Sequence, residues 1–331
     1  MRKRTFMLLN ALPIMASAAG TITIPTRFET DRVYVELTTA SGARLELYTD
    51  TGGGGLVLSR VAVARLGLEV LKSNDPEIKA ELGPDAGLAT APTLRAGLPP
   101  LPKIAFVVPA ATQVPGWPEQ RDGFLGASWF AGGIWTWDYP GRRLVRQPNQ
   151  ATVEVGAHVV SLAFKVDPDG SRPTSFARLS IRVNGEQLPM LLDTGAETFL
   201  TPAALAEIGD GGIAMRATSM VAAAVFDGWH NRHPGWRYIP DGQAGTHAAM
   251  IEVPSVEIAG FATGPAWFTR RSDANFHDFM SSMMDARVEG AVGGNVLRSF
   301  EMTVDYPAAR AVFRCVVDCR VASPASTDID R

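Results

Sequence analysis

Short apolar runs, many of them alternating with polar residues, recur along the chain and predict β-strands. The predicted strands span residues 33–38, 43–48, 104–108 and 134–137 in the first half, and 178–183, 188–192, 250–258 and 301–304 in the second. A two-residue Asn-Gly turn signal at 184–185 predicts a hairpin between two of them. Helix starts follow Ser59 and Thr201, where a hydroxyl residue caps the segment and Pro202 follows the second cap.

Two sequence blocks recur in the same order, so we expect the chain to be an internal repeat. The first block is an apolar segment that ends in Asp-Thr-Gly, at 45–52 and again at 188–195. Each copy is followed by a short apolar stretch and then by one of the two helix starts. The second block is Asp122-Gly-Phe-Leu-Gly126 in one half and Glu289-Gly-Ala-Val-Gly293 in the other, with Thr-x-Asp-Tyr-Pro further on in both.

The spacing of the blocks locates an insertion in the second half. The offset between the second blocks is 167 (289 − 122), whereas the offset between the Asp-Thr-Gly copies is 143 (193 − 50). The second half therefore holds the difference, 24 extra residues, between its blocks. We expect them within 215–246, either as a solvated loop or as a loop that covers a binding cleft with aromatic side chains.

The ends of the chain suggest export. A basic start at 2–4, an apolar stretch at 6–15 and the small-x-small sequence at 16–18 are typical of a cleaved signal peptide; an N-terminal strand or a membrane anchor are the alternatives. The apolar run is too short to span a bilayer easily. We expect a signal peptide at 1–19, an N-terminal lobe at 20–152, a C-terminal lobe at 153–319 and a disordered tail at 320–331. The mature protein should be periplasmic or extracellular and should not associate with the membrane.

Composition narrows the class of protein. The 331 residues suffice for two ordinary domains, and a formal charge of −3 gives no reason to expect nucleic acid as a partner. The 32 Gly and 23 Pro favour turns and strands over a helix bundle. The two cysteines, Cys315 and Cys319, could form a disulfide only through a tight turn, because an extended strand would hold them about 13 Å apart. A metal site is not expected, at this pair or at His230, His233 and His247.

The paired Asp-Thr-Gly copies suggest a specific chemistry. An unpaired carboxylate buried at the end of an apolar strand would be costly or would take up a proton. Two symmetry-related copies, Asp50 and Asp193, can share one proton and hold a water between them. One carboxylate then acts as general base on the water, and the protonated partner donates to a scissile carbonyl. Sequences typical of serine and zinc hydrolases, Gly-x-Ser-x-Gly and His-Glu-x-x-His, do not occur.

On these motifs the chain resembles the pepsin-like and retropepsin-like aspartic proteases, and its export signal adds a likeness to exported aspartyl proteases of the bacterial type. The resemblance implies a mainly β, bilobal aspartic-protease fold with an inter-lobe cleft. It implies an extended peptide or protein substrate, no cofactor and a monomeric protein. It also implies a role for each motif residue: catalysis for Asp50 and Asp193, support of the catalytic loops for Thr51, Gly52, Thr194 and Gly195, and locking of those loops for Leu125, Gly126, Val292 and Gly293.

Three departures keep a second function open. Gly53 and Ala196 stand where such enzymes usually carry Ser or Thr, and the run 52–55 holds one extra residue, which we expect to loosen the first loop. No Tyr lies between 71 and 111, where the family has one in its flap, and Phe106 is the only aromatic residue there. The leading hypothesis is an aspartic endopeptidase. The alternative is an inactive pepsin-like module that binds ligands in the inter-lobe cleft.

Overall fold

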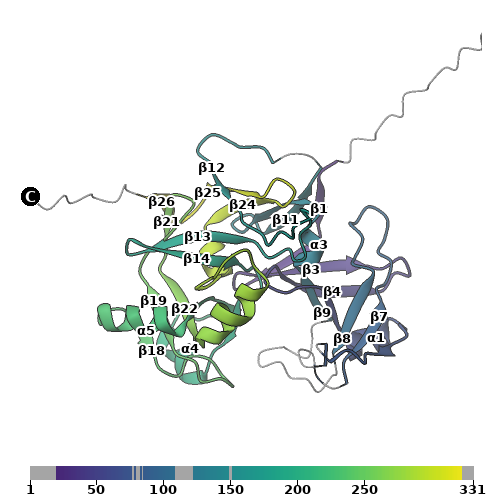
Figure 1. Cartoon of the computed structure of the whole chain (residues 1–331), viewed down its shortest axis with the longest axis horizontal. Helices are drawn as coiled ribbons and strands as arrows, with labels where there is room; N and C mark the ends of the chain where they lie inside the picture. The colour runs from purple at the N-terminus through teal and green to yellow at the C-terminus, as the bar shows by residue number, and fades with distance from the viewer. Residues whose placement is uncertain are drawn as a thin grey trace, which may run out of the picture.

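The computed structural model describes residues 20–76, 78–79, 83, 85–108, 122–148 and 151–322. The predicted signal peptide and residues 323–331 of the predicted tail lie outside the described residues. The described chain forms three large β-sheets with short helices at their faces, so the fold is mainly β, as predicted (Figure 1). Within these ranges no helix is long and apolar enough to cross a membrane.

The first lobe is an eight-stranded sheet in the order β2-β3-β4-β9-β5-β8-β7-β6. Its strands are β2 (Thr26–Glu29), β3 (Arg32–Thr38), β4 (Arg44–Asp50), β5 (Leu56–Ser59), β6 (Leu71–Lys72), β7 (Gly87–Thr90), β8 (Ile104–Val108) and β9 (Gly123–Gly126). The helices α1 (Arg60–Arg65) and α3 (Ala127–Phe130) follow β5 and β9. The Ser59 hydroxyl caps α1 by accepting from the N–H of Ala62 at 3.1 Å, which confirms the predicted helix start.

The second lobe is a ten-stranded sheet in the order β18-β19-β22-β17-β23-β14-β13-β20-β21-β26. Its elements are β13 (Arg178–Val183), β14 (Glu186–Leu192), β17 (Ser219–Ala222), α5 (Ala223–Arg232), β18 (Tyr238–Ile239), β19 (Met250–Val253), β20 (Val256–Ile258), β21 (Phe261–Thr263), β22 (Ala266–Arg271), the π-helix η1 (Ala274–Met280), β23 (Gly290–Val292), α6 (Gly294–Leu297) and β26 (Cys319–Val321). Along β13, Leu179, Ile181 and Val183 are buried between more exposed residues, and the predicted hairpin joins it to β14.

A six-stranded sheet connects the lobes, in the order β1-β11-β10-β24-β25-β12. Its strands are β1 (Ile22–Ile24), β10 (Ile134–Asp138), β11 (Arg143–Gln147), β12 (His158–Ser161), β24 (Phe300–Asp305) and β25 (Arg310–Cys315). At its centre β10 and β24 run antiparallel with Thr136 opposite Thr303, and the two hydroxyls are 2.8 Å apart. These two residues are related by the same offset, 167, as the second sequence blocks, so equivalent positions of the two halves face each other there.

Strand order in the two lobes shows where the extra residues lie. The strand order from β6 to β3 in the first sheet matches the order from β18 to β13 in the second. In this match β17 corresponds to β5, and the helix α5 that follows it corresponds to α1. Val57 pairs with Phe124, and Met220 pairs with Ala291, so Val57 and Met220 occupy equivalent positions at an offset of 163 (220 − 57). Since the offset between the aspartates is 143, 20 of the 24 extra residues precede β17.

We expected the extra residues within 215–246, and for most of them this location is therefore wrong. The extra chain lies within the 197–217 segment, which we call the insertion. It is the hairpin of β15 (Glu197–Phe199) and β16 (Met215–Ala217) with α4 (Pro202–Ile208) between them. Thr201 caps α4 as predicted, but α4 has no counterpart in the described part of the first lobe. Residues 223–232 are neither a solvated loop nor a cleft cover, because α5 buries Phe226 and Trp229, and Trp229 packs edge-on against Phe268.

Two smaller expectations also need correction. The predicted strand 250–258 is two strands, β19 and β20, because Pro254 between them has no N–H to donate to a sheet. Arg320 and Val321, which we expected in the disordered tail, form β26 with Cys319 and pair with β21.

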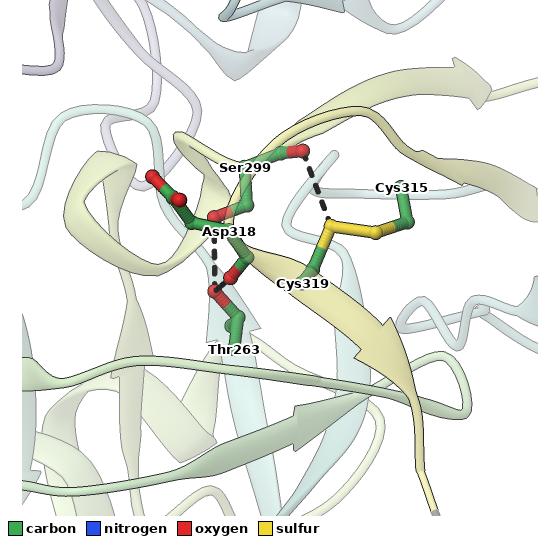
Figure 2. The surroundings of a disulfide bond; sticks show 5 residues. All are labelled: Thr263, Ser299, Cys315, Asp318 and Cys319. Carbon is green, nitrogen blue, oxygen red and sulfur yellow. Dashed lines mark hydrogen bonds between the residues drawn. A yellow bond between two sulfur atoms is a disulfide. The ribbon is translucent and has the colours of Figure 1, made fainter.

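The two cysteines form a disulfide. Cys315 ends β25 and Cys319 begins β26, and the turn between them brings their Cα atoms to 5.8 Å. Asp318 takes a left-handed backbone conformation in that turn (φ 51°). Figure 2 shows the Sγ of Cys319 facing the carbonyl of Ser299, with the hydroxyls of Ser299 and Thr263 bonded to each other beside the turn.

Candidate active site

The two Asp-Thr-Gly loops meet between the lobes. Asp50 is the last residue of β4, and Asp193 directly follows β14. Each carboxyl accepts a hydrogen bond from the glycine N–H of its own loop: Gly52 to Asp50 at 3.1 Å and Gly195 to Asp193 at 2.8 Å. Each carboxyl also lies against the glycine of the opposite loop. A Cβ on Gly52 would come within 2.4 Å of the Asp193 Cγ, and one on Gly195 within 2.2 Å of the Asp50 Oδ1. Only glycine fits at these two positions.

The two threonines bind the loops to each other. The Thr51 hydroxyl donates to the carbonyl of Leu192 at 2.8 Å and accepts from the N–H of Thr194 at 2.9 Å. In the same way, the Thr194 hydroxyl donates to the carbonyl of Thr49 at 3.4 Å and accepts from the N–H of Thr51 at 3.3 Å. Both threonines are buried, so water does not compete for these bonds.

The four residues expected to lock the loops all contact them. In the first lobe Leu125 and Gly126 of β9 lie beside Thr49 and Asp50 of β4 in parallel register. In the second lobe Val292 lies beside Leu192, and its carbonyl accepts from the N–H of Asp193 at 3.0 Å. A Cβ on Gly293 would come within 3.0 Å of the Ala196 Cβ, directly after the second Asp-Thr-Gly, and the Gly293 N–H donates to the Ser219 hydroxyl at 3.1 Å.

The glycine run after Asp50 is held by hydrogen bonds, contrary to our expectation that the extra residue loosens it. The carbonyls of Gly53, Gly54 and Gly55 accept from the N–H groups of Ala127, Ser128 and Gly126 at 2.7, 3.1 and 2.8 Å. A Cβ on Gly126 would come within 2.5 to 2.8 Å of the Gly53–Gly55 backbone, so this close packing requires a glycine.

The electrostatics of the two aspartates are unequal. Burial raises the pKa of both carboxyls. For Asp193 the negative charge of Asp50 raises the pKa further, to well above its usual value. For Asp50 a hydrogen bond from Asp193 and the N–H groups of Gly53 and Gly52 oppose the effect of burial on the pKa. The pair therefore keeps one proton to a higher pH than a free carboxyl would, and the pKa values belong to the pair.

Sequence reasoning missed a charged cluster behind the dyad. Arg32, at the start of β3 and 1% exposed, lies 2.8 Å from Glu29 and 3.4 Å from Glu197, which follows the second catalytic loop. The charge of Glu197 also raises the pKa of Asp50. The insertion is held to the same turn of the first lobe, because the N–H of Ala217 donates to the carbonyl of Thr30 at 3.0 Å. The composition of a single chain gives no signal for a pairing between two residues so far apart in sequence.

A cleft of about 770 Å³ opens beside Asp50 and is lined by both lobes. Its apolar wall includes Phe106, Phe124, Phe176, Phe279, Met280 and Met283. Phe106 is thus at the cleft, although it cannot offer the hydroxyl of a flap Tyr. Sequence reasoning also missed the second-lobe wall, although the run of Phe and Met at 276–284, just before the second block, signals it. The aromatic residues of 226–238 do not line this cleft.

Comparisons with known proteins give likeness of structure only. No protein-family model matches the chain, and no curated protein matches it in sequence. Among solved structures, an aspartic proteinase from Irpex lacteus is 10% identical with a TM-score of 0.48, covering 90% of this chain and 98% of that one. A basic 7S globulin from soybean is 12% identical with a TM-score of 0.47, covering 89% and 95%.

A retropepsin-like aspartic protease from Rickettsia conorii is 14% identical with a TM-score of 0.28, covering 53% of this chain and 99% of that one. All three scores are below 0.5, and the matching proteins carry both protease and globulin names. The chain is thus similar to pepsin-like and retropepsin-like structures, and the choice of function depends on the residues of its own site.

Proposed function

We propose that the protein is an aspartic endopeptidase that hydrolyses peptide bonds with a water activated between Asp50 and Asp193. The observation that carries the proposal is the meeting of the two carboxyls, each against the glycine of the opposite loop, with burial raising the pKa of both. Groups with such perturbed titration in a cleft are typical of catalytic sites.

The geometry supports a division of labour. Ionised Asp50 takes a proton from the water as the water oxygen attacks the scissile carbonyl carbon, and Asp193 gives its proton to the carbonyl oxygen. The tetrahedral intermediate then loses the amine when the proton on Asp50 passes to the nitrogen and the C–N bond breaks. One hydroxyl proton returns to Asp193, which restores the starting state. No cofactor and no covalent intermediate are needed.

An extended peptide with large apolar side chains suits the cleft. The wall that Phe106, Phe176 and Phe279 share with two methionines removes apolar surface from water, and methionines adapt to side chains of varied shape. Both aspartates come from one chain, so a monomer contains a complete site.

The decisive experiment is cleavage of a library of unstructured peptides, read by mass spectrometry. We expect the wild-type protein to cut at discrete sites. Asp50→Asn and Asp193→Asn should each lower kcat/KM by about a thousandfold or more, because the pair acts as a unit. Asp169→Asn, in an exposed turn, is the matched control and should keep full activity. Retained turnover in either site variant would refute the shared-proton mechanism.

A binding module without catalysis is the second candidate, favoured by the missing hydroxyl at Gly53 and by the absence of a Tyr between 71 and 111. On that hypothesis folded wild-type protein binds library peptides in the cleft but cuts none at any pH. The Asn variants would then bind as tightly as the wild type. Measuring binding and cleavage on the same peptides separates the two functions.

We also propose that the protein works outside the cytoplasm. The basic, apolar and small-residue pattern from Arg2 to Ala18 supports export, and the Cys315–Cys319 disulfide suits an oxidising compartment. N-terminal sequencing of the protein recovered from the extracellular or periplasmic fraction tests this. A mature chain starting near residue 19 is the expected result.

A further inference from the structure

One partly buried cation of the second lobe has no anion. Arg271 ends β22, and its guanidinium donates to the Gln243 side-chain oxygen at 2.5 Å and to the carbonyl of Arg270 at 3.5 Å. Among the residues that the structure describes, no carboxylate lies within ion-pair distance of it. Burial lowers the pKa of Arg271 to about 10, with no opposing contribution from an acidic neighbour. A guanidinium in that setting is costly unless an anion joins it.

Other shielded arginines of the described chain differ in this respect. Arg32 lies against Glu29 and Glu197, Arg216 pairs with Asp210 at 2.6 Å, and Arg178 pairs with Asp285 at 2.5 Å. The neighbour of Arg271 in sequence, Arg270, pairs with Asp227 of α5 at 2.8 Å. Arg271 thus lacks the carboxylate that each of these four arginines has, and a ligand can supply one there.

The surroundings of Arg271 can hold a carboxylate. The Gln243 side-chain oxygen already accepts from Arg271 and from the Thr246 hydroxyl, the latter at 3.0 Å. This orientation leaves the Gln243 amide nitrogen as a donor that makes no hydrogen bond within the described chain. A forked guanidinium beside an amide N–H₂ matches the two oxygens of a carboxylate.

Strand order places Arg271 at the position in the second lobe that matches the cleft wall of the first, although the cavity beside Asp50 is not lined by Arg271 or Gln243. In the sheet β22 takes the place of β8, and Ile104 and Phe106 of β8 line the cavity beside Asp50. Arg271 shares a face of β22 with Thr269, opposite the face on which Phe268 packs under α5. Gln243 forms an isolated β-bridge with Leu200, seven residues after Asp193 in the sequence. The π-helix η1, which carries the cleft residue Phe279, follows Arg271.

On the basis of the proposed peptidase function, we propose that Arg271, with Gln243, binds a carboxylate of the substrate and makes the protein prefer peptides that carry an acidic group at that position. In the pairing of β17 with β22, Phe268 lies opposite Ser219, which is next to the catalytic loop. Arg271 lies three residues further along β22. Three residues of extended chain span about 10 Å, so the acidic group should lie roughly three residues from the scissile bond. It is either an Asp or Glu side chain or the peptide's own C-terminus.

The test uses a neutral peptide that the wild type cuts, with Glu placed singly at each of four positions on either side of the scissile bond and Gln as the matched partner. At one position we expect kcat/KM for Glu to exceed that for Gln by about tenfold or more. Arg271→Met should reduce this ratio to about one. Arg271→Lys should keep part of the preference, and Arg270→Met is the matched control with an unchanged ratio.

Further comparisons identify the carboxylate that binds and the results that would overturn the proposal. A preference seen only between free and amidated C-termini identifies the terminal carboxylate as the ligand. An unchanged Glu/Gln ratio in folded Arg271→Met overturns the proposal, as does a wild-type ratio near one at every position. If the wild type cuts no peptide, the proposed peptidase function fails instead, and fluorescence anisotropy of the labelled Glu and Gln peptides still tests Arg271 by comparing their Kd values in wild type and Arg271→Met.

Discussion

The residues of the catalytic loops carry a consequence for pH. Where Ser or Thr is usual after Asp-Thr-Gly, this chain has Gly53 and Ala196, so neither loop offers a hydroxyl there. Burial raises the pKa of Asp50 and Asp193, and backbone N–H groups are the donors that remain. Fewer donors to the ionised form leave a higher pKa. The pair should therefore hold its single negative charge only at a higher pH than in enzymes that keep both hydroxyls.

We accordingly predict an activity optimum in the mildly acidic range, about pH 5 to 6.5. The acidic limb reports ionisation of Asp50, and the alkaline limb reports loss of the shared proton on Asp193. A pH–rate profile of kcat/KM on one cleaved peptide measures both as properties of the pair. An acidic limb with an apparent pKa below about 2.5 would show that other donors replace the missing hydroxyls.

Restoring the hydroxyl by mutation should fail. A Cβ at Gly53 would lie 2.5 Å from the Asp50 Oδ2, whereas a Cβ at Gly54 would have only a Phe176 ring atom at 4.0 Å. A Cβ at Gly53 must displace the Asp50 carboxyl, so Gly53→Ser should lower kcat/KM by roughly tenfold or more. Overpacking of this kind also costs about 1 to 3 kcal/mol of folding stability. Gly54→Ser, one position on, is the matched control and should change little. Equal activity of the two variants would contradict the close contact at Gly53.

At the scale of elements, the insertion links the second catalytic loop to the β2–β3 turn of the first lobe. It starts at Glu197, two residues after Gly195, and returns at Ala217, whose N–H bonds to Thr30. Arg32 lies under this junction with Glu29 on one side and Glu197 on the other. The two carboxylates share one guanidinium, but Glu197, unlike Glu29, follows a catalytic loop, and its negative charge raises the pKa of Asp50.

This difference gives a paired prediction. Glu197→Gln removes a charge that raises the pKa of Asp50, so the acidic limb of the pH–rate profile should move to lower pH. Glu29→Gln also weakens the ion pair with Arg32 but should leave that limb in place. Thermal unfolding of both variants controls for the loss of the ion pair itself. An acidic limb that does not move in Glu197→Gln would remove this residue from the electrostatics of the dyad.

The sequence predicted local structure better than it predicted equivalence between the halves. Alternation identified strands such as β13, and capping chemistry at Ser59 and Thr201 identified real helix starts. The same capping chemistry misled the comparison, because a cap reports only that a helix begins and not which strand precedes it. The insertion was therefore assigned to 215–246, and α5 was read as a loop because Gly228 and two histidines obscure its helical pattern.

Some residues of the candidate site could be predicted from the sequence and others could not. The Asp-Thr-Gly pair and the second blocks could be read because they recur. The structure brings the ten site residues predicted from them together, and their catalytic roles stay a prediction. The Arg32–Glu197 pair and the position of Arg271 depend on contacts between segments far apart in sequence. Such contacts leave no periodic pattern in one chain, so only the three-dimensional structure reveals them.

At the scale of the whole molecule, the lobes meet across two buried carboxyl groups, and this should cost stability as pH rises. Below the ordinary aspartate pKa of 3.8 both folded and unfolded chains are protonated, so the pair contributes no difference. Above it the unfolded chain releases protons that the folded site retains, because the folded pKa values are raised. The contribution of the dyad to stability therefore falls as pH increases towards neutrality.

Asp193→Asn should remove part of this loss. The Asn side-chain oxygen can still accept from the N–H of Gly195, and the amide does not ionise. We predict that the unfolding temperature of Asp193→Asn relative to wild type rises between about pH 4 and about pH 7.5. Circular dichroism melts at both pH values measure the difference, with Asp169→Asn as the control. A difference that is constant with pH would mean that the dyad does not strain the fold.

The pairing of β10 with β24 at the centre of the connecting sheet has a consequence for how the chain folds. β10 belongs to the first half, yet the edge that it offers to β24 is covered only by residues 300–305, near the end of the chain. Until those residues are made, that strand edge is open and can recruit another chain. Contacts of such long sequence separation form slowly. The order of synthesis therefore leaves the connecting sheet incomplete until the last strands arrive, and a truncated first half would be prone to aggregate.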